Sequence, residues 1–234
     1  MVSGFRMLGI LTLDTRFPRI PGDVGSPRTF SFPVRIVVVR GANVEEIVHD
    51  RNDAWLAPFS QAIDSLADAG CTGVVTTCGF LIRWQAALAH SSRIPVLTSS
   101  LLQLGLVQAT LRAGSRVGVV TYSARDLDAE ALQAAGAPID TPIAGVPEDS
   151  YFASVIRHGA PDLDRDRMRE DTVCAALRLL DAHPDVGAIV LECANMPPYR
   201  DAVRIATGRP VFDAATLITW FHAGLAAPRG AESS

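Results

Sequence analysis

Short runs of β-branched and other apolar residues alternate along the chain with longer segments in which apolar residues recur every three or four positions. Some short runs, such as residues 36–39 and 189–191, are apolar at every position, which is typical of strands covered on both faces. This alternation predicts an α/β fold with parallel sheets and helices on each side. The predicted strands span residues 7–13, 35–40, 73–77, 95–98, 116–121, 188–192 and 210–213. The predicted helices span residues 53–69, 81–90, 100–113, 124–135, 164–182 and 214–226.

Residues 14–33 interrupt this rhythm. The segment is 20 residues long, contains four prolines and two glycines, and shows no periodicity. A loop of this length in a compact domain is usually a functional lid or a disordered stretch. Because it follows the first predicted strand, we expect it to leave from the carboxyl edge of the sheet, where α/β proteins bind their ligands.

The two halves of the chain repeat one pattern. One predicted strand ends near Cys78 and another near Cys193, 115 residues later (193 − 78). A proline follows each cysteine, and Pro95 and Pro210 are also 115 residues apart (210 − 95). We infer two pseudo-symmetric, parallel-sheet α/β domains with the active site in the cleft between them. The first would comprise residues 1–98 together with 210–234 and carry Cys78, and the second would comprise residues 99–209 and carry Cys193.

Both cysteines are placed where a strand ends and a helix begins. Unpaired N–H groups and the helix dipole favour negative charge there, so we expect these positions to favour thiolate. Two thiols on opposite sides of one cleft could invert a carbon next to a carbonyl, one removing a proton and the other returning one. The other two cysteines, Cys71 and Cys174, are expected to be ordinary core residues.

Composition excludes several other kinds of chemistry. All 21 basic residues are arginine, so a lysine Schiff base and a P-loop lysine are both impossible. A formal net charge of −4 argues against nucleic-acid binding, and the sequence contains no apolar run long enough to span a membrane. The start of the chain does not look like a signal peptide, so a cytoplasmic protein is expected. The five histidines are at least 25 residues apart, and a dinucleotide fingerprint is missing, so we expect neither a metal nor a cofactor.

Three segments resemble the aspartate/glutamate racemase superfamily, particularly its less characterised branch with Phe-Pro-Arg and Pro-Gly-Asp in the first loop. They are residues 9–19, the turn at 76–80 and the turn at 191–195, and the resemblance covers nearly the whole chain. It implies a cofactor-independent enzyme with two cysteines as acid and base, related to hydantoin racemase, maleate isomerase and arylmalonate decarboxylase. The turns read Cys-Gly-Phe and Cys-Ala-Asn, whereas the amino-acid racemases usually have Cys-Asn-Thr and Cys-Thr-His. This departure favours a less polar acid or a cyclic, imide-like substrate over free aspartate or glutamate.

Cys78 and Cys193 are therefore the predicted catalytic residues. The resemblance implies substrate contacts at Asp14, Gly79, Phe80, Ala194 and Asn195. Strand-end positions add Thr77, Ser99, Thr121 and Tyr122 as predicted substrate-binding residues. Carboxylate-binding arginines are predicted at Arg16, Arg19 and Arg83.

The favoured hypothesis is a racemase or isomerase acting next to a carboxylate or related carbonyl of an amino acid or similar acid. Its predicted partner is a small-molecule carboxylate or hydantoin-like substrate, and a homodimer is possible. Two alternatives stay open. One is a single-cysteine decarboxylase of a malonate-type acid, and the other is a non-catalytic protein that binds small acids on the same fold.

Overall fold

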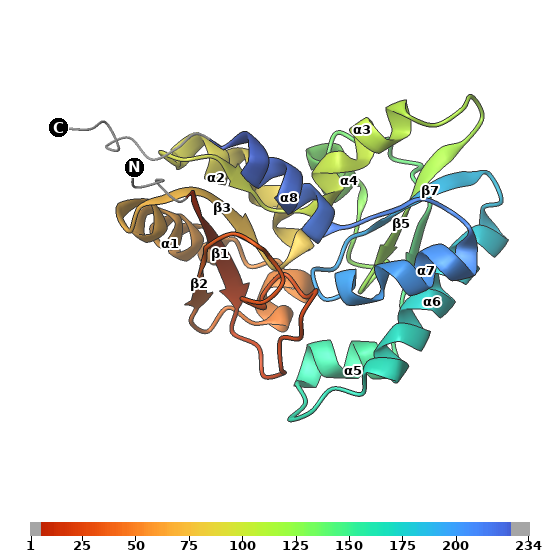
Figure 1. Ribbon diagram of the computed structural model, residues 1–234, viewed down its shortest axis with the longest axis horizontal. Helices are drawn as coiled ribbons and strands as arrows, with labels where there is room; N and C mark the ends of the chain where they lie inside the picture. Colours follow the sequence, from red (N-terminus) through yellow and green to blue (C-terminus); the bar gives the residue numbers. More distant parts are fainter. Residues whose placement is uncertain (1–5, 226–234) are drawn as a thin grey trace.

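The computed structural model describes residues 6–225, which form two lobes side by side, each built on a four-stranded parallel sheet (Figure 1). The first sheet has the order β2-β1-β3-β4, formed by β1 (Met7–Leu13), β2 (Val34–Val39), β3 (Cys71–Thr76) and β4 (Val96–Leu97). The second has the order β6-β5-β7-β8, formed by β5 (Arg116–Thr121), β6 (Ile143–Gly145), β7 (Val186–Leu191) and β8 (Val211–Phe212). The predicted α/β architecture is confirmed.

The strand register repeats along with the strand order. Gly9 of β1 pairs with Val74 of β3, and Gly118 of β5 pairs with Ile189 of β7. A Cβ on Gly9 would lie 2.7 Å from Leu66 Cδ1, and one on Gly118 would lie 2.8 Å from Leu179 Cδ2. Both glycines therefore let a helix approach the first strand of its lobe closely, and the repeat seen in the sequence is structural.

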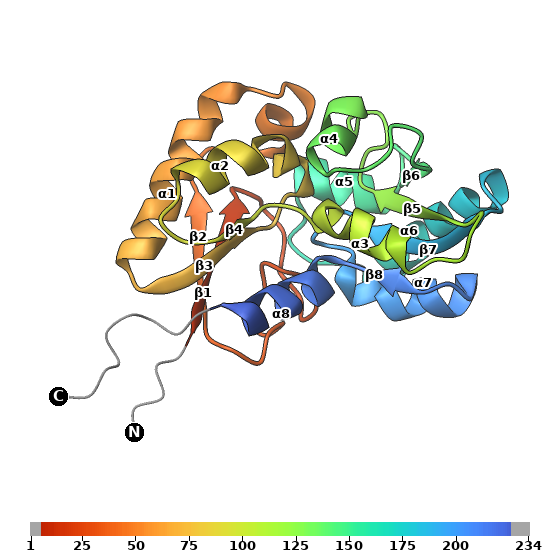
Figure 2. The same ribbon diagram turned by 90° about the horizontal axis from the view of Figure 1, so that it is seen from above.

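Helices cover both faces of the first sheet. Successive residues of β1 point to opposite faces, so Leu8 and Ile10 lie on one side and Leu11 on the other. Leu11 packs in one hydrophobic cluster with residues of α1 (Leu56–Asp68) and α2 (Gln85–Ser91). Leu8 and Ile10 pack in a second cluster with residues of α8 (Ala214–Gly224), which crosses the opposite face (Figure 2).

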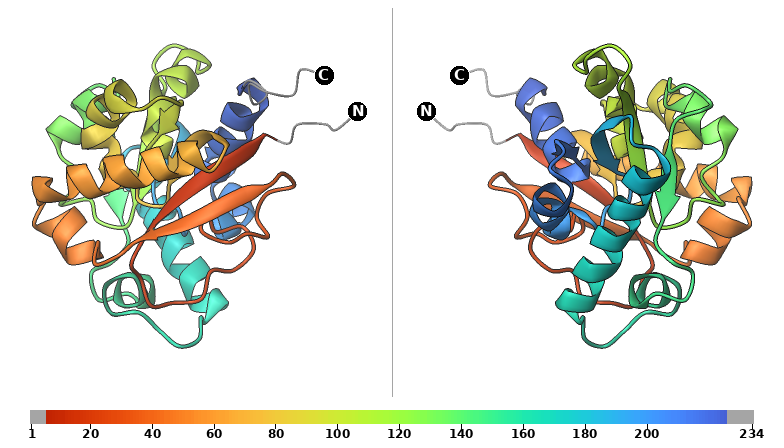
Figure 3. Two further views of the ribbon diagram at one scale, coloured as in Figure 1. Left: turned by 90° about the vertical axis from the view of Figure 1, so that its left-hand side faces the viewer. Right: turned by 90° about the vertical axis from the view of Figure 1, so that its right-hand side faces the viewer.

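The second lobe has its own helices. The long α6 (Arg165–Ala182) contacts β5 and β6, and α3 (Leu104–Ala109) contacts β5 and β7. The shorter helices are α4 (Ala129–Ala134), α5 (Tyr151–His158) and α7 (Arg200–Thr207). Figure 3 shows β1 and β2 at the outer side of the first lobe in its left panel and α6 running along the second lobe in its right panel. Within residues 6–225, no helix has the length and apolar character needed to cross a membrane.

Residues 210–225 divide between the lobes, which differs from the predicted domain boundaries. β8 pairs with β7 and so belongs to the second sheet, whereas the next element, α8, packs on the first. The first half is arranged in the same way, because β4 belongs to the first sheet and the following α3 packs on the second. Each sheet is thus covered by the helix that follows the other sheet's last strand, and among the described residues the predicted boundaries differ from this packing at β8. Residues 1–5 and 226–234 of the predicted domains, including the end of the helix predicted over 214–226, lie outside the described part.

Several predicted elements differ in detail. The sequence pattern did not predict β6, α5 or α7, which are short, and α7 has only Val203 fully buried. Two predicted helices begin as tight 3₁₀ turns, η3 (Gly79–Trp84) and η4 (Ser100–Gln103). The helix predicted over 124–135 starts only at Ala129, because the Asp128 side chain caps it by accepting the Ala131 N–H.

The loop at 14–33 is an ordered strap between the lobes. Its Val24 N–H donates to the carbonyl of Ala194 in the second lobe, at 3.1 Å. The Arg16 carbonyl accepts a hydrogen bond from the Ala160 N–H, which follows α5, at 3.0 Å. The strap therefore ties the carboxyl end of β1 to the second lobe across the cleft.

Candidate active site

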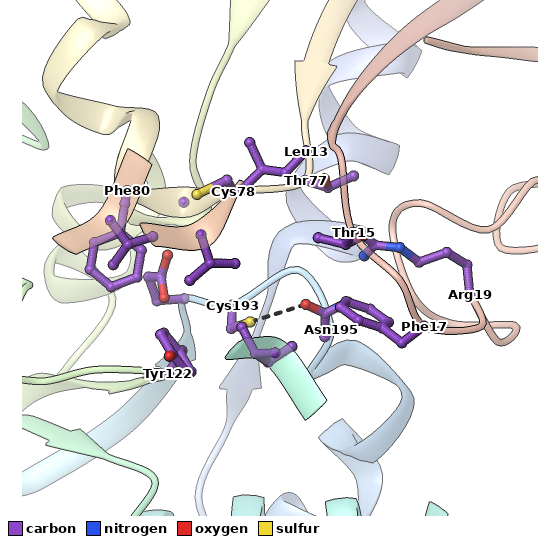
Figure 4. A pocket seen from close by; sticks show the side chains of 15 residues that line it. Leu13, Thr15, Phe17, Arg19, Thr77, Cys78, Phe80, Tyr122, Cys193 and Asn195 are labelled. Carbon is purple, nitrogen blue, oxygen red and sulfur yellow. Dashed lines mark hydrogen bonds between the residues drawn. The ribbon is translucent and has the colours of Figure 1, made fainter. Parts of the chain in front are cut away.

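The carboxyl ends of β1, β3 and β7 meet at one small pocket between the lobes. Cys78 follows β3, Cys193 follows β7, and the strap enters from β1 (Figure 4). This is the edge at which parallel α/β sheets bind ligands. The lining residues are Leu13, Thr15, Phe17, Arg19, Val44, Val48, Thr77, Cys78, Gly79, Phe80, Tyr122, Ile156, Glu192, Cys193 and Asn195.

Cys78 lies in a turn that offers its sulfur hydrogen-bond donors. It is the residue before η3, so the backbone N–H groups of Phe80 and Leu81 favour its thiolate, as does the charge on Arg83. Only 8% of Cys78 is exposed, however. Burial first, and then the Glu192 carboxylate, raise the pKa of Cys78 to about 12.

Cys193 is equally enclosed. Its sulfur donates to Asn195 Oδ1 at 3.5 Å. Burial, followed by Glu192, raises the pKa of the Cys193 thiol well above its ordinary value. The expected preference of both positions for thiolate is therefore wrong in direction, because desolvation outweighs the turn amides.

Glu192 is the site residue that the sequence reasoning missed. It is the residue after β7 and is only 1% exposed. Thr121 Oγ1 donates to its Oε2 at 2.7 Å, whereas Oε1 has no hydrogen-bond partner among the described residues. Burial raises the pKa of Glu192 to about 7. The signal for it was available, since an acidic residue directly after an apolar strand of a parallel sheet lies at the edge where such sheets bind ligands.

The raised pKa makes Glu192→Gln a stabilising substitution at high pH. The pKa is about 7 in the folded protein against 4.5 unperturbed, so folding becomes less favourable as the pH rises between these values. We expect the Gln variant to exceed wild type in unfolding free energy by up to about 3 kcal/mol near pH 8. Near pH 4 the difference should vanish, because the carboxyl is then protonated in both states. Urea titrations at the two pH values measure this, and a difference independent of pH would contradict the burial argument.

A polar network on the strap borders the Cys193 side of the pocket. Asp23, only 2% exposed, accepts a hydrogen bond from Asn195 Nδ2 at 2.6 Å and one from the Gly25 N–H at 2.7 Å. It also forms an ion pair with Arg19, 3.2 Å away. Arg19 NH2 in turn donates to Thr15 Oγ1 at 2.8 Å, and its guanidinium lies 4.5 Å from the centre of the Phe17 ring. Asp23 therefore holds both Asn195 and Arg19 in place at the pocket.

A second set of contacts closes the cleft on the opposite side. His49 Nδ1 lies 2.9 Å from Asp126 Oδ2, and Arg51 NH1 donates to Asp128 Oδ2 at 2.6 Å. Arg51 has a φ of 52°, a conformation that a side chain other than glycine rarely adopts. The His49 ring also lies near Tyr122, with Nε2 3.5 Å from the phenolic oxygen. These contacts join the two lobes directly beside the pocket.

The structure brings most of the predicted site residues together. Both predicted catalytic residues and five predicted substrate-binding residues line the pocket, namely Cys78, Cys193, Thr77, Gly79, Phe80, Tyr122 and Asn195. Thr121 reaches it indirectly through Glu192. Among the predicted arginines, Arg19 lines the pocket, whereas Arg83 NH2 donates to the carbonyl of Ile47 at 2.7 Å. The chemical roles of all these residues stay predictions.

Four predicted substrate-binding residues lie elsewhere. Asp14 and Arg16 line a neighbouring pocket, and Thr15 between them borders both pockets. The Ser99 side chain caps η4 by accepting the Leu101 N–H at 3.2 Å. Ala194 is buried in the hydrophobic cluster with α8.

The remaining cysteines and possible metal ligands add nothing to the site. Cys71 is buried as predicted, but Cys174 is exposed, so its assignment to the core was wrong. Within residues 6–225, no three His, Cys, Asp or Glu side chains gather closely enough to hold a metal ion.

Two comparisons of the sequence identify relatives. The family model described as Asp/Glu/Hydantoin racemase matches residues 30–221. A dimethylsulfoniopropionate lyase of Durusdinium sp. clade D is 30% identical over 226 residues, which cover 93% of this chain and 74% of the relative. Dimethylsulfoniopropionate lyase 3 of Emiliania huxleyi (strain CCMP1516) is 32% identical over 237 residues, covering 96% of this chain and 61% of the relative. The chain thus spans about three fifths to three quarters of the length of these two relatives.

Solved structures share the fold at low sequence identity. The Gly74Cys mutant of arylmalonate decarboxylase superposes with a TM-score of 0.63 at 17% identity, covering 96% of this chain and 97% of the other. Allantoin racemase from Klebsiella pneumoniae superposes with a TM-score of 0.62 at 19% identity, covering 96% and 91%. At these identities the likeness establishes the fold alone.

The relatives overturn the predicted reaction. We expected a racemase or isomerase, but the curated relatives that match nearly the whole chain at 30–32% identity are named as lyases. The prediction assumed that one cysteine removes a proton and the other returns one, which inverts the carbon. An elimination also needs a base to remove a proton, but no acid that returns one to the same carbon. The family and these relatives indicate an enzyme. The chain belongs to the Asp/Glu/hydantoin racemase family.

Proposed function

We propose that this protein is a carbon–sulfur lyase that eliminates dimethyl sulfide from dimethylsulfoniopropionate or a close β-sulfonio carboxylate. The observation that carries the proposal is the 30–32% identity to dimethylsulfoniopropionate lyases over 93–96% of the chain. A pocket lined by two cysteines, a carboxylate, aromatic rings and an arginine supports it.

The elimination requires one base and no redox cofactor. A base takes the proton from C2, next to the carboxylate, and the C2–H electron pair forms the C2=C3 double bond. The C3–S bond breaks with its electron pair on sulfur, which leaves as neutral dimethyl sulfide, and acrylate remains. Because the leaving group departs without charge, it needs no acid to protonate it.

Cys78 is the base in this proposal. Burial raises the pKa of both thiols, but two turn amides and Arg83 act to lower that of Cys78, whereas Cys193 has one such amide, from Asn195. The Cys193 thiol already donates to Asn195 Oδ1. Cys193 therefore stays protonated on the opposite side of the pocket, with its S–H held by Asn195.

The pocket lining supplies a partner for each end of a zwitterionic substrate. Figure 4 places Arg19 on one side of the cysteine pair and Phe80 and Tyr122 on the other. Arg19 binds the carboxylate, helped by the Thr77 hydroxyl, which is buried and has no partner among the described residues. The faces of Phe80 and Tyr122 attract the sulfonium cation. C2 then lies between the two sulfurs.

Arg19→Met tests the carboxylate contact. A lost charge-assisted contact is worth about 1.5–3 kcal/mol, so KM should rise about 10- to 100-fold with a smaller change in kcat. Arg16→Met is the matched control, because Arg16 is on the same strap but lines the neighbouring pocket. Initial rates over a range of substrate concentrations give both constants. Equal KM values for the two variants would show that Arg19 does not bind the substrate carboxylate.

The proposed activity is tested by incubating purified protein with dimethylsulfoniopropionate and measuring dimethyl sulfide in the headspace by gas chromatography. We expect release that depends on protein concentration and stops after thiol alkylation. Release no faster than in the protein-free buffer would reject the proposed function.

A further inference from the structure

Cys193 begins a series of hydrogen bonds that leads from the second lobe to the strap. Its S–H donates to Asn195 Oδ1 at 3.5 Å, and Asn195 Nδ2 donates to Asp23 Oδ2 at 2.6 Å. Asp23 ends the series, because it also accepts from the Gly25 N–H at 2.7 Å and pairs with Arg19 at 3.2 Å. Cys193, Asn195 and Asp23 are all buried, so water competes little for these contacts.

The direction of the series is fixed at Asp23. A carboxylate accepts hydrogen bonds and donates none. Each hydrogen bond that the described residues make to the Asp23 side chain comes from a donor, namely Arg19, the Gly25 N–H and the Asn195 amide. Asn195 must therefore turn its NH2 group toward Asp23 and its carbonyl oxygen toward Cys193. A sulfur that faces a carbonyl oxygen at this distance is stabilised as a thiol and not as a thiolate.

The first lobe has no such acceptor at the equivalent position. Phe80 is the second residue after Cys78, as Asn195 is the second residue after Cys193. The Phe80 side chain cannot accept the proton of a thiol, and the Cys78 sulfur is instead favoured as thiolate by the N–H groups of Phe80 and Leu81. The repeat therefore places two cysteines in one pocket but gives only one of them a hydrogen-bond acceptor.

We infer that Asp23 is a positioning residue, which sets the direction of these hydrogen bonds, keeps Cys193 a thiol and so leaves Cys78 as the single base, an inference that rests on the proposed function. Asp23 reaches neither sulfur and acts through Asn195. Inversion of a carbon requires two groups that exchange the roles of acid and base, whereas an elimination requires one base. Because Asp23 also pairs with Arg19, the same carboxylate holds the arginine that binds the substrate.

The charges around Cys193 act in the same direction as the hydrogen bond. Burial is the largest cause that raises the pKa of Cys193, Glu192 is the next, and Cys78 and Asp23 add to them. The Asn195 N–H opposes these causes and is outweighed. The contact with Asn195 Oδ1 thus stabilises the protonated form that burial and charge already favour.

Asp23→Asn is expected to reverse the series at almost unchanged size. The Gly25 N–H can only donate, so the new amide keeps its oxygen there and turns its NH2 group toward Asn195. The Asn195 amide then turns over, accepts with Oδ1 and presents Nδ2 to the Cys193 sulfur. A donor at the sulfur favours thiolate, so the pKa of Cys193 should fall.

Alkylation by iodoacetamide at pH 8 measures this without substrate, with peptide mass spectrometry following Cys193 and Cys78 separately. We expect the ratio of the Cys193 rate to the Cys78 rate to be at least about threefold higher in Asp23→Asn than in wild type. A fall of one pKa unit raises the thiolate fraction about tenfold and lowers the nucleophilicity of the thiolate about threefold. The ratio cancels a general change in access to the pocket, and an unchanged ratio would overturn the inference.

Asp23→Ala separates the direction of the hydrogen bonds from the charge. It removes the same carboxylate and frees Arg19 equally, but it offers Asn195 no donor, so the Asn195 oxygen can stay at the sulfur. The ratio should therefore rise less than in Asp23→Asn. Equal rises in the two variants would show that only the charge of Asp23 matters, and would overturn the inference.

The Raman S–H stretching band of Cys193 tests the same contact with the strap intact. The difference between wild type and Cys193→Ala isolates this band, and the difference between wild type and Cys174→Ala gives the band of an exposed thiol in the same protein. We expect the Cys193 band at lower frequency, as for a hydrogen-bonded S–H. A Cys193 band at the Cys174 frequency, or no band, would contradict the inference.

The lyase activity and the role of Asp23 fail separately, because these readouts need no substrate. The expected alkylation ratios without dimethyl sulfide release would reject only the lyase. Release of dimethyl sulfide with an unchanged ratio in Asp23→Asn would reject only the role of Asp23.

Discussion

Replacing Cys78 by alanine should reduce dimethyl sulfide release about 1,000-fold, within the range contributed by a general base. The substitution removes the sulfur that takes the C2 proton, and the neighbouring Glu192 cannot replace it because its free oxygen lies against Gly79. Since only one sulfur atom is lost, the protein should still fold, and its thermal midpoint should remain within a few degrees of wild type.

Cys71 offers a matched control at the start of β3, the strand that leads to Cys78. It is buried, 4% exposed, at the start of β3 and outside the pocket lining, so Cys71→Ala should retain nearly full activity. Cys193→Ala should lose less activity than Cys78→Ala, because it removes a thiol that does not take the C2 proton. The reverse order, with Cys193→Ala the more impaired, would assign the base to the other lobe.

Gly79→Ala should impair both folding and activity. The added Cβ would overlap Glu192 Oε1 and lie 3.0 Å from the Glu192 carbonyl oxygen. Overpacking of this kind costs about 1–3 kcal/mol of unfolding free energy. The clash moves the turn that carries Cys78 relative to Glu192, and a displacement of about 1 Å at a reacting group can cost about 100-fold in rate. Thermal unfolding and initial rates on the same preparation measure the two effects.

Gly105 supplies the comparison for this substitution. It lies in α3 with nothing within 4 Å of the position of an added Cβ. Gly105→Ala should therefore leave activity unchanged and stabilise the helix by up to about 1 kcal/mol. If Gly79→Ala kept the activity and stability of Gly105→Ala, Glu192 would not pack closely against the turn that carries Cys78.

Much of the architecture could be predicted from the sequence, because it follows from local patterns of apolar residues and from the spacing of repeated residues. The fully apolar strands and the common spacing after Cys78 and Cys193 predicted two similar lobes with both cysteines at one cleft. The structure places both cysteines in one pocket. What the pattern could not show was the pairing of β8 with β7, since the place of a two-residue strand depends on tertiary packing and not on its own sequence pattern.

The remaining errors have physical causes. The direction of side chains on the strap depends on its tertiary contacts: Arg19 lies in the pocket, whereas Asp14 accepts a hydrogen bond from the Gly41 N–H and lies outside it. The thiol pKa values depend on burial, which a turn motif does not reveal. The reaction depends on the substrate, and a pair of cysteines serves elimination as readily as inversion.

Proton NMR of wild-type protein with dimethylsulfoniopropionate, recorded in D₂O as the reaction proceeds, observes the proposed bond changes themselves. Elimination predicts that acrylate and dimethyl sulfide appear in equal amounts while the substrate disappears, with both slowed together in Cys78→Ala. Formation of 3-hydroxypropionate in place of acrylate would show that the C–S bond is broken by displacement, and a substrate left intact would show that this protein is not such a lyase.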